Sequence, residues 1–167
     1  MLSKEMCTLL NKQIETEGQA SQVYLAMASW AEVQGFSGVA SFLYHHSEEE
    51  RMHMLKLIHY INERGGHALV PNLKAVPTTF ESVNQVFSSV LEHEVKVSNE
   101  INAVVDHCLK EKDYATHNFM QWYVTEQLEE EHLARTLLDK LNLIGTDKGG
   151  FYLFDRDLET LSKGETK

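Results

Sequence analysis

The sequence predicts an all-α protein: a bundle of four long helices, a long crossover between the second and third, and a short C-terminal fifth helix. Three observations predict this fold. Apolar side chains recur at three- and four-residue steps over four long segments, which is the spacing of one helix face. Only two prolines and nine glycines interrupt the 167 residues. Residues 65–79 hold both prolines and lack a helical period, so they form a connection long enough to run the length of a bundle.

The first two helices are expected over residues 4–34 and 38–64. Gly35 ends the first, and Gly65 begins the break after the second. The repeating face of the first helix carries Leu10, Ile14, Glu17, Tyr24, Ala28 and Ala31. The repeating face of the second carries Leu43, His46, Glu50, Leu57 and Ile61. Each helix is about 40 Å long at ~1.5 Å per residue, so a site at mid-length lies far from both ends of the bundle.

The later helices have their own start signals. Thr78 and Glu81 have the spacing of a capping box and are expected to open the third helix, which fades near residues 110–112. Its repeating face carries Val83, Phe87, Val90, Glu94, Val97, Ile101 and Val105. Asp113 is expected to cap the fourth helix, whose face carries Phe119, Tyr123, Glu126, Glu130, Leu133, Leu137 and Leu141. Residues 151–162 predict the short fifth helix, and residues 163–167 a frayed tail.

Composition narrows the class of protein. The length favours one domain over residues 1–167. Fifteen basic against 25 acidic residues give a net charge of −10, which argues against nucleic acid as a partner because phosphate contacts need clustered Lys and Arg. Cys7 and Cys108 form no CxxC pair, so a cysteine-held metal or a disulfide framework is not expected. The sequence shows neither a signal peptide nor an apolar run of about 18 residues, so no membrane partner and a cytoplasmic location are expected.

Each predicted helix places one carboxylate on its apolar face. Glu17, Glu50, Glu94 and Glu130 stand where core residues are expected, with apolar neighbours three to seven residues away. Burying one unpaired carboxylate costs several kcal/mol, and four together repel one another. Such acids must therefore either take up protons or bind metal ions. Oxygen ligands with an imidazole favour iron or manganese.

The spacing of these residues indicates an internal duplication. Glu17 is followed by Glu50 and His53, and Glu94 is followed at the same intervals by Gln127 and Glu130. All three pairs are offset by 77 residues (17 to 94, 50 to 127, 53 to 130). Side chains three residues apart on a helix are neighbours, so each pair can hold one ion while a bridging carboxylate reaches two. The sequence therefore predicts a two-metal centre in the bundle core.

Over nearly its whole length the chain resembles the bacterial non-haem ferritins. The similarity is carried by residues 46–54 (HSEEERMHM), 118–132 (NFMQWYVTEQLEEEH) and 151–161 (FYLFDRDLETL). The resemblance implies a ferritin-like bundle that binds one iron through Glu17, Glu50 and His53. It implies that Glu50 bridges to a second iron, and that a third position lies farther out. The second iron would be held by Glu94, with Gln127 and Glu130 nearby, and the third would lie near Glu49, Glu126, Glu129 and Glu130.

The resemblance also implies a function. Members of this family are ferroxidases: they oxidise Fe(II) with O2 or hydrogen peroxide and store the product as mineral inside a hollow shell of 24 subunits. Tyr24 matches a tyrosine beside the two irons, and Trp122 a neighbouring tryptophan. No haem is expected, because Arg51 occupies the place of the haem-ligating Met of bacterioferritins and Met52 comes one residue later, about 100° round the helix.

Two other functions compete with iron storage. The first is a di-iron or di-manganese oxidase acting on an organic substrate or peroxide, which needs a pocket beside the metals. The second is a passive helical scaffold whose buried acids are protonated.

Several residues also have plainer interpretations than a role in the metal centre. His132 forms a Glu-x-x-His pair with Glu129 but falls on a different face from Glu130, so it is expected at the surface or in a subunit contact. His46 is expected to be a hydrogen-bonded core histidine rather than a ligand, and Trp122 to be a core residue. Tyr24 is open to a core-packing interpretation, and Glu126 and Glu129 to that of a solvated acidic patch.

Overall fold

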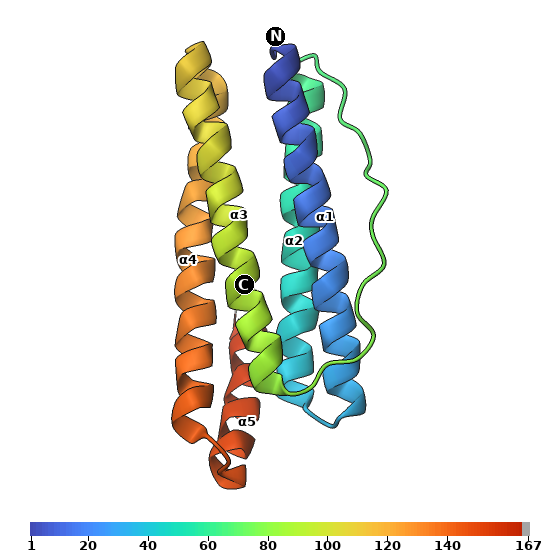
Figure 1. Ribbon diagram of the computed structural model, residues 1–167, viewed down its shortest axis with the longest axis vertical. Helices are drawn as coiled ribbons and strands as arrows, with labels where there is room; N and C mark the ends of the chain where they lie inside the picture. The colour runs from blue at the N-terminus through green and yellow to red at the C-terminus, as the bar shows by residue number, and fades with distance from the viewer. Residues whose placement is uncertain (165–167) are drawn as a thin grey trace.

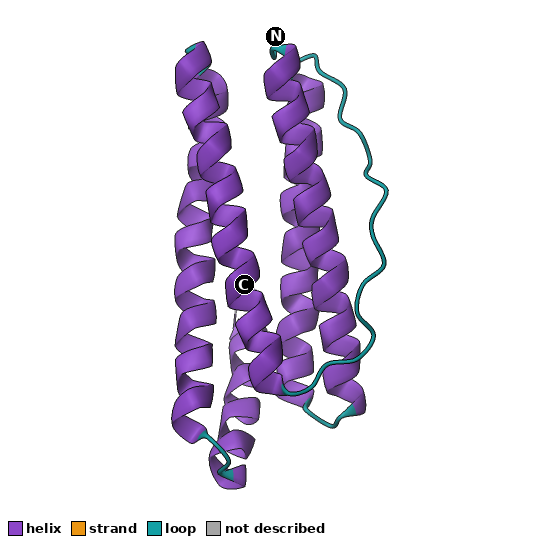
Figure 2. Ribbon diagram, viewed as in Figure 1, coloured by secondary structure: helices purple, strands orange, loops and turns teal. Residues whose placement is uncertain are grey.

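The computed structural model describes residues 1–164, and within them it contains five helices and no strand. Figures 1 and 2 show four long helices side by side, with a short fifth helix at one end. The chain leaves α2 and crosses the full length of the bundle along the outside of α1 before it enters α3 (Figure 1). The predicted fold class is therefore confirmed. The helices are α1 (Lys4–Val33), α2 (Ser37–Glu63), α3 (Val83–Glu111), α4 (Tyr114–Ile144) and α5 (Lys148–Gly164).

Side-chain caps explain where three of the helices begin. The Ser3 hydroxyl accepts the amide N–H of Met6 at the start of α1, at 3.0 Å. The carboxylate of Asp113 accepts the amide N–H of Thr116 at 3.0 Å and caps α4, as predicted. The hydroxyl of Ser82 accepts the amide N–H of Gln85 at 3.1 Å and caps α3.

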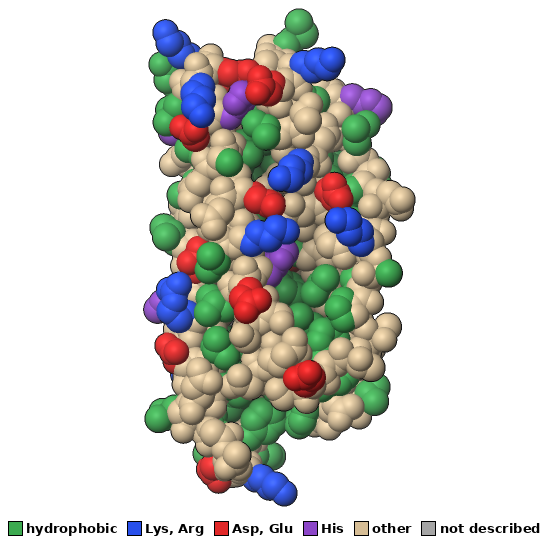
Figure 3. Space-filling view, viewed as in Figure 1, with side chains coloured by type: hydrophobic (Ala, Val, Ile, Leu, Met, Phe, Trp, Pro, Cys, Tyr) green, Lys and Arg blue, Asp and Glu red, His purple; other side chains and the backbone are tan. Residues whose placement is uncertain are grey.

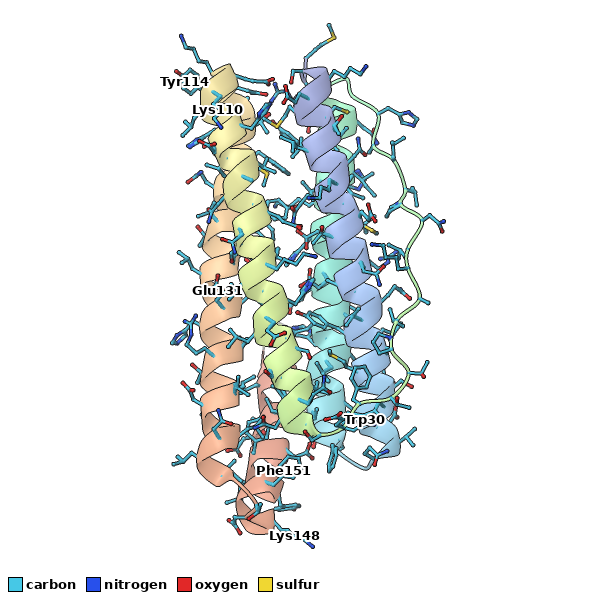
Figure 4. The ribbon with its side chains drawn as sticks, viewed as in Figure 1. Trp30, Lys110, Tyr114, Glu131, Lys148 and Phe151 are labelled. Atoms are coloured by element: carbon cyan, nitrogen blue, oxygen red, sulfur yellow. The ribbon has the colours of Figure 1, made fainter. Side chains whose placement is uncertain are left out.

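The predicted start of the third helix was wrong. Thr78 and Glu81 precede the helix, and α3 begins at Val83. Phe80, which lies between Thr78 and Glu81 in the sequence, packs edge-on against Trp30 of α1, with ring centroids 5.7 Å apart. This contact holds the end of the crossover against the bundle, so the cap falls at Ser82 instead (Figure 4 labels Trp30).

The fifth helix is longer than predicted. It begins at Lys148, where the carboxylate of Asp147 accepts the amide N–H of Gly150 at 2.8 Å. Residues 163 and 164, expected to fray, still belong to α5, and residues 165–167 of the expected tail lie outside the described residues. Phe154 and Leu158 of α5 are buried in the core.

The core has two apolar parts with polar residues between them. One part includes Leu10, Leu57, Ile101 and Met120 and lies where α1 begins. The other includes Leu43, Phe87, Leu137 and Phe154 and lies where α5 docks. The buried acids belong to the stretch between these two parts.

The surface is mixed in character. Acidic and basic side chains alternate with apolar ones on the face shown in Figure 3. Among the described residues, no helix combines the length and the apolar character that crossing a membrane requires.

Candidate metal centre

All four long helices contribute polar side chains to the middle of the bundle. Their apolar faces turn inward, and the acids on those faces are carried inward with them. The six side chains predicted from the duplicated motif are at most 8% exposed: Glu17, Glu50, His53, Glu94, Gln127 and Glu130. The two halves of the motif differ in their contacts.

The first half forms a group with metal-ligand geometry. Glu17, Glu50 and His53 each offer a donor atom, and these atoms lie within 4.8 Å of one another. The Gln13 amide donates a hydrogen bond to Glu17 Oε1 at 2.8 Å. The other carboxylate oxygen of Glu17 and one of Glu50 are buried without a hydrogen bond from any described residue. Buried oxygens without donors are costly, and a cation between them would satisfy both.

Burial dominates the electrostatics of these acids. It raises the pKa of Glu17 well above its usual range, and repulsion from Glu50 adds to the shift. It likewise raises the pKa of Glu50, with repulsion from Glu94 as the next cause. Burial raises the pKa of Glu94 to about 7. Without a metal ion the centre therefore holds protons, which a bound cation would replace.

In the second half of the motif, the carboxylate already accepts hydrogen bonds. The Tyr24 hydroxyl donates to Glu94 Oε1, and the Gln127 amide donates to Glu94 Oε2 at 3.1 Å. The same amide donates to the backbone carbonyl of Glu94 at 3.2 Å. Both carboxylate oxygens of Glu94 thus have a donor, whereas Glu17 and Glu50 each have one buried oxygen without a donor among the described residues.

Glu130 turns toward a different partner. Its Oε2 lies 3.4 Å from Nε2 of His46, and the two form a second group with Glu49. Burial alone would lower the pKa of His46, but its interaction with Glu130 outweighs this and raises the pKa to about 9. Burial alone would raise the pKa of Glu130, but His46 brings it below its usual value. The two therefore form an ion pair.

The predicted burial and hydrogen bonding of His46 are confirmed. His46 is buried, and its Nδ1 lies 3.1 Å from the carbonyl oxygen of Phe42, as expected of a hydrogen-bonded core histidine. The pairing with Glu130 was missed. The only available signal was that His46 lies on the same helix face as Glu50 and His53.

The outer acids surround a recess of about 320 Å³. The recess is open to solvent, and Glu129 is exposed while Glu126 is partly buried. His132 is exposed, as expected, yet it lines the same recess. The lining residues are His46, Glu49, Glu126, Glu129, Glu130, His132 and Leu133.

Two aromatic residues flank the centre differently. Tyr24 is 1% exposed and its hydroxyl faces the acids. Trp122 was expected in the core, but it is 38% exposed. Position 122 is turned about 100° from Tyr123, which takes the core position. The Trp122 ring stands edge-on to His53, with centroids 5.2 Å apart, and the Lys56 ammonium lies 4.1 Å from the centroid of the Trp122 ring.

A family model for the ferritin-like domain matches residues 7–144. The chain belongs to the ferritin family. It is 44% identical to a probable bacterial non-heme ferritin-like protein of Haemophilus influenzae, over 97% of this chain and 98% of that protein. It is 42% identical to a bacterial non-heme ferritin of Campylobacter jejuni, over the full length of both chains.

Solved structures support the same family. The open pore ferritin of the archaeon Archaeoglobus fulgidus superimposes with a TM-score of 0.93 at 38% identity, over 95% of this chain and 98% of that one. The predicted ferritin-like fold and the resemblance to bacterial non-haem ferritins are thus confirmed. Membership of this family supports, at that broad level, a ferritin that oxidises and stores iron.

Proposed function

We propose that this ferritin oxidises Fe(II) at a two-iron centre and stores the Fe(III) as mineral inside a hollow shell of 24 subunits. The observation that carries the proposal is the set of buried carboxylates at mid-bundle, two of which have an oxygen without a donor among the described residues. Such a site is stable only when protons or cations neutralise it. Iron is the substrate and cargo: two Fe(II) ions supply the two electrons that reduce O2 to peroxide, or peroxide to water.

The first iron is assigned to Glu17, Glu50 and His53. One nitrogen and two oxygens within 4.8 Å of one another suit a divalent first-row ion. Glu50 is assigned the bridging role, because its carboxyl group is close enough to Glu94 for their charges to repel.

The second iron is assigned to Glu94, with Gln127 and Glu130 nearby. This half replaces a carboxylate by a neutral amide, and Glu130 is paired with His46. A second ion must share the Glu94 oxygens with the hydrogen bonds that they accept from Tyr24 and Gln127. Looser retention of iron in this half suits a protein through which iron passes on its way to a mineral.

A third iron position is assigned to the recess lined by Glu49, Glu126, Glu129 and Glu130. Its four carboxylates concentrate negative charge on one side of the centre. A solvated acidic patch is the competing interpretation. Metal-binding stoichiometry of a Glu129→Gln variant separates the two, because a patch without a site leaves the number of bound ions unchanged.

Initial rates of Fe(II) oxidation test the catalytic assignment. Replacing Glu17, Glu50 or Glu94 by Ala should lower the fast initial rate by tenfold or more, about 1.4 kcal/mol or greater in barrier. The matched control is Glu15→Ala, an exposed glutamate on the same helix. Unchanged initial rates of Fe(II) oxidation in all three variants would contradict the catalytic assignment.

An oxidase acting on an organic substrate is the alternative. A groove of about 490 Å³ reaches His53 and is also lined by Met52, Trp122 and Glu126. Iron analysis separates the functions: a store accumulates hundreds of ions per assembly, an enzyme about two per chain, and a passive scaffold none.

The size of the assembly is the simplest test of storage. Light scattering should give one species near 24 × 19.1 kDa, whereas a monomer would contradict the shell. The related archaeal protein is an open pore ferritin, and this relationship supports a shell here. A cytoplasmic location remains a prediction from the sequence.

A further inference from the structure

A third group of potential metal ligands lies away from the buried centre. Glu5, at the start of α1, meets His107 and Glu111, at the end of α3. One donor atom of each residue lies within 4.8 Å of the others. Figure 4 shows this end of the bundle, where Lys110 is labelled. Glu5 and Glu17 are twelve residues apart on α1, about 18 Å at ~1.5 Å per residue, so the two groups are separate.

Hydrogen bonds already hold part of this group in place. His107 and Glu111 are four residues apart and therefore share one face of α3. The Ser3 hydroxyl lies 2.8 Å from both carboxylate oxygens of Glu111. Because Ser3 also caps α1, it ties Glu111 to the helix that carries Glu5. The Ser3 contact thus brings ligands from two helices together. It involves only Glu111, so the metal-ligand atoms of Glu5 and His107 stay out of it.

One nitrogen of this group has a carboxylate neighbour but makes no hydrogen bond within the described part of the chain. His107 Nε2 lies 3.1 Å from Glu111 Oε1, yet it makes no hydrogen bond with any described residue and is screened from solvent. A ring nitrogen in this situation has lost its hydration, and its contact with the carboxylate is not a hydrogen bond. A metal ion bound by Nε2 and the neighbouring carboxylate would satisfy it.

We propose that Glu5, His107 and Glu111 bind a divalent first-row transition-metal ion, such as Zn²⁺ or Fe²⁺, independently of the buried centre. An imidazole with two carboxylates is a donor set that such ions accept, with water in the remaining position. Ligand atoms about 2.0–2.2 Å from an ion lie up to ~4 Å apart, so small side-chain rotations suffice. Glu5 is exposed and its side chain can make that rotation.

Zinc binding to the metal-free assembled protein tests the proposal. Isothermal titration near pH 7 should show one more Zn²⁺ per chain in the parent than in His107→Gln, or at least tenfold weaker binding of that ion in the variant. His67→Gln, at an exposed histidine in the crossover, is the matched control and should bind as the parent does. Crystals soaked in zinc should give an anomalous peak between Glu5, His107 and Glu111, and the buried centre serves as the positive control.

Equal stoichiometry and affinity in the parent and His107→Gln would overturn the proposal, as would zinc at the buried centre but none at this group. Glu5→Gln provides a second variant at an exposed position, in case His107→Gln perturbs folding. Initial Fe(II) oxidation should be unchanged in both variants. The outcome is therefore independent of the proposed iron oxidation.

Discussion

At the scale of single residues, the centre is governed by the protons its carboxyl groups hold. Glu17, Glu50 and Glu94 are each at most 4% exposed, and burial is the main cause of their raised pKa values. Metal ions and protons therefore compete for the same oxygens. Three measurable consequences follow, two for pH dependence and one for Tyr24.

The stability of the metal-free protein should fall as pH rises from about 4.5 to about 7. Folding raises the pKa of Glu94 from 4.5 to about 7, so in this window the native state binds more protons than the unfolded state. The free energy of unfolding then decreases with pH, by up to about 3 kcal/mol for this one group. Denaturant titrations across this pH range measure the slope, and Glu94→Gln should flatten it. An equal slope in that variant would contradict the assignment.

Metal binding should show the opposite dependence. Below pH 7 a cation must displace the proton of Glu94. The affinity for the metal ion should therefore weaken as pH falls, by about tenfold per pH unit for each proton released. Zinc titrations in buffers of different ionisation enthalpy count these protons. Proton release that is absent at pH 6 would show that the acids are already ionised.

Replacing Tyr24 by Phe tests whether its hydroxyl matters beyond packing. The hydroxyl donates to Glu94, and this hydrogen bond lowers the pKa of that acid. Its loss should raise the pKa of Glu94, weaken the second metal ion and slow Fe(II) oxidation several-fold. Tyr123→Phe is the matched control, because the Tyr123 hydroxyl donates to the His53 backbone carbonyl at 2.8 Å and not to an acid. Equal effects of the two variants would leave Tyr24 with a packing role only.

At the scale of helices, α5 supplies a cap for the N-terminus of α2. Phe36 occupies the cap position of α2 and offers no side-chain hydrogen bond. Instead, the Asp155 carboxylate of α5 accepts the amide N–H of Val39 at 2.9 Å. Gly38 makes this approach possible, since a Cβ there would stand 1.6 Å from the Asp155 carbonyl oxygen. A cap supplied by a distant helix thus fixes the position of α5.

Substitutions at this junction should destabilise the docking of α5. Asp155→Ala should cost about 1 kcal/mol as a lost cap. Gly38→Ala should cost more, because α5 must shift, even though Ala favours helix by about 1 kcal/mol. Thermal unfolding measures both, and Gly149→Ala, whose Cβ would meet no atom closer than 3.7 Å, is the control. A stabilised Gly38→Ala would show that α5 is not seated there.

At the scale of the whole molecule, the two apolar parts of the core hold the polar stretch between them. Apolar packing at the two ends stabilises the fold and offsets the free-energy cost of burying the acids. Apolar side chains also remain outside the core near α5. Leu143 is 89% exposed and Leu153 is 47% exposed, and both line a groove of about 220 Å³.

Assembly should depend on this exposed apolar region. Leu153→Arg should shift the light-scattering mass below the 24 × 19.1 kDa of the proposed shell, because a charge there cannot be buried in a subunit contact without a partner. Thr160→Arg, at an exposed polar position of the same helix, is the control. An intact assembly in Leu153→Arg would show that this region does not take part in subunit contacts.

The sequence by itself determined the four long helices, the crossover and the inward placement of the motif residues. Each of these follows from a local period of 3.6 residues, which brings Glu17, Glu50 and Glu94 inward with their apolar neighbours. The cap at Asp113 is equally local, because the carboxylate bonds an amide three residues away.

Only the tertiary structure decided the remaining contacts. The start of α3 depends on Phe80 meeting Trp30, and the cap of α2 on Asp155. The pairing of Glu130 with His46 joins residues 84 positions apart (46 to 130). Such contacts depend on how helices pack side by side, and the helical period that places a residue on a face does not determine which residue it will meet there.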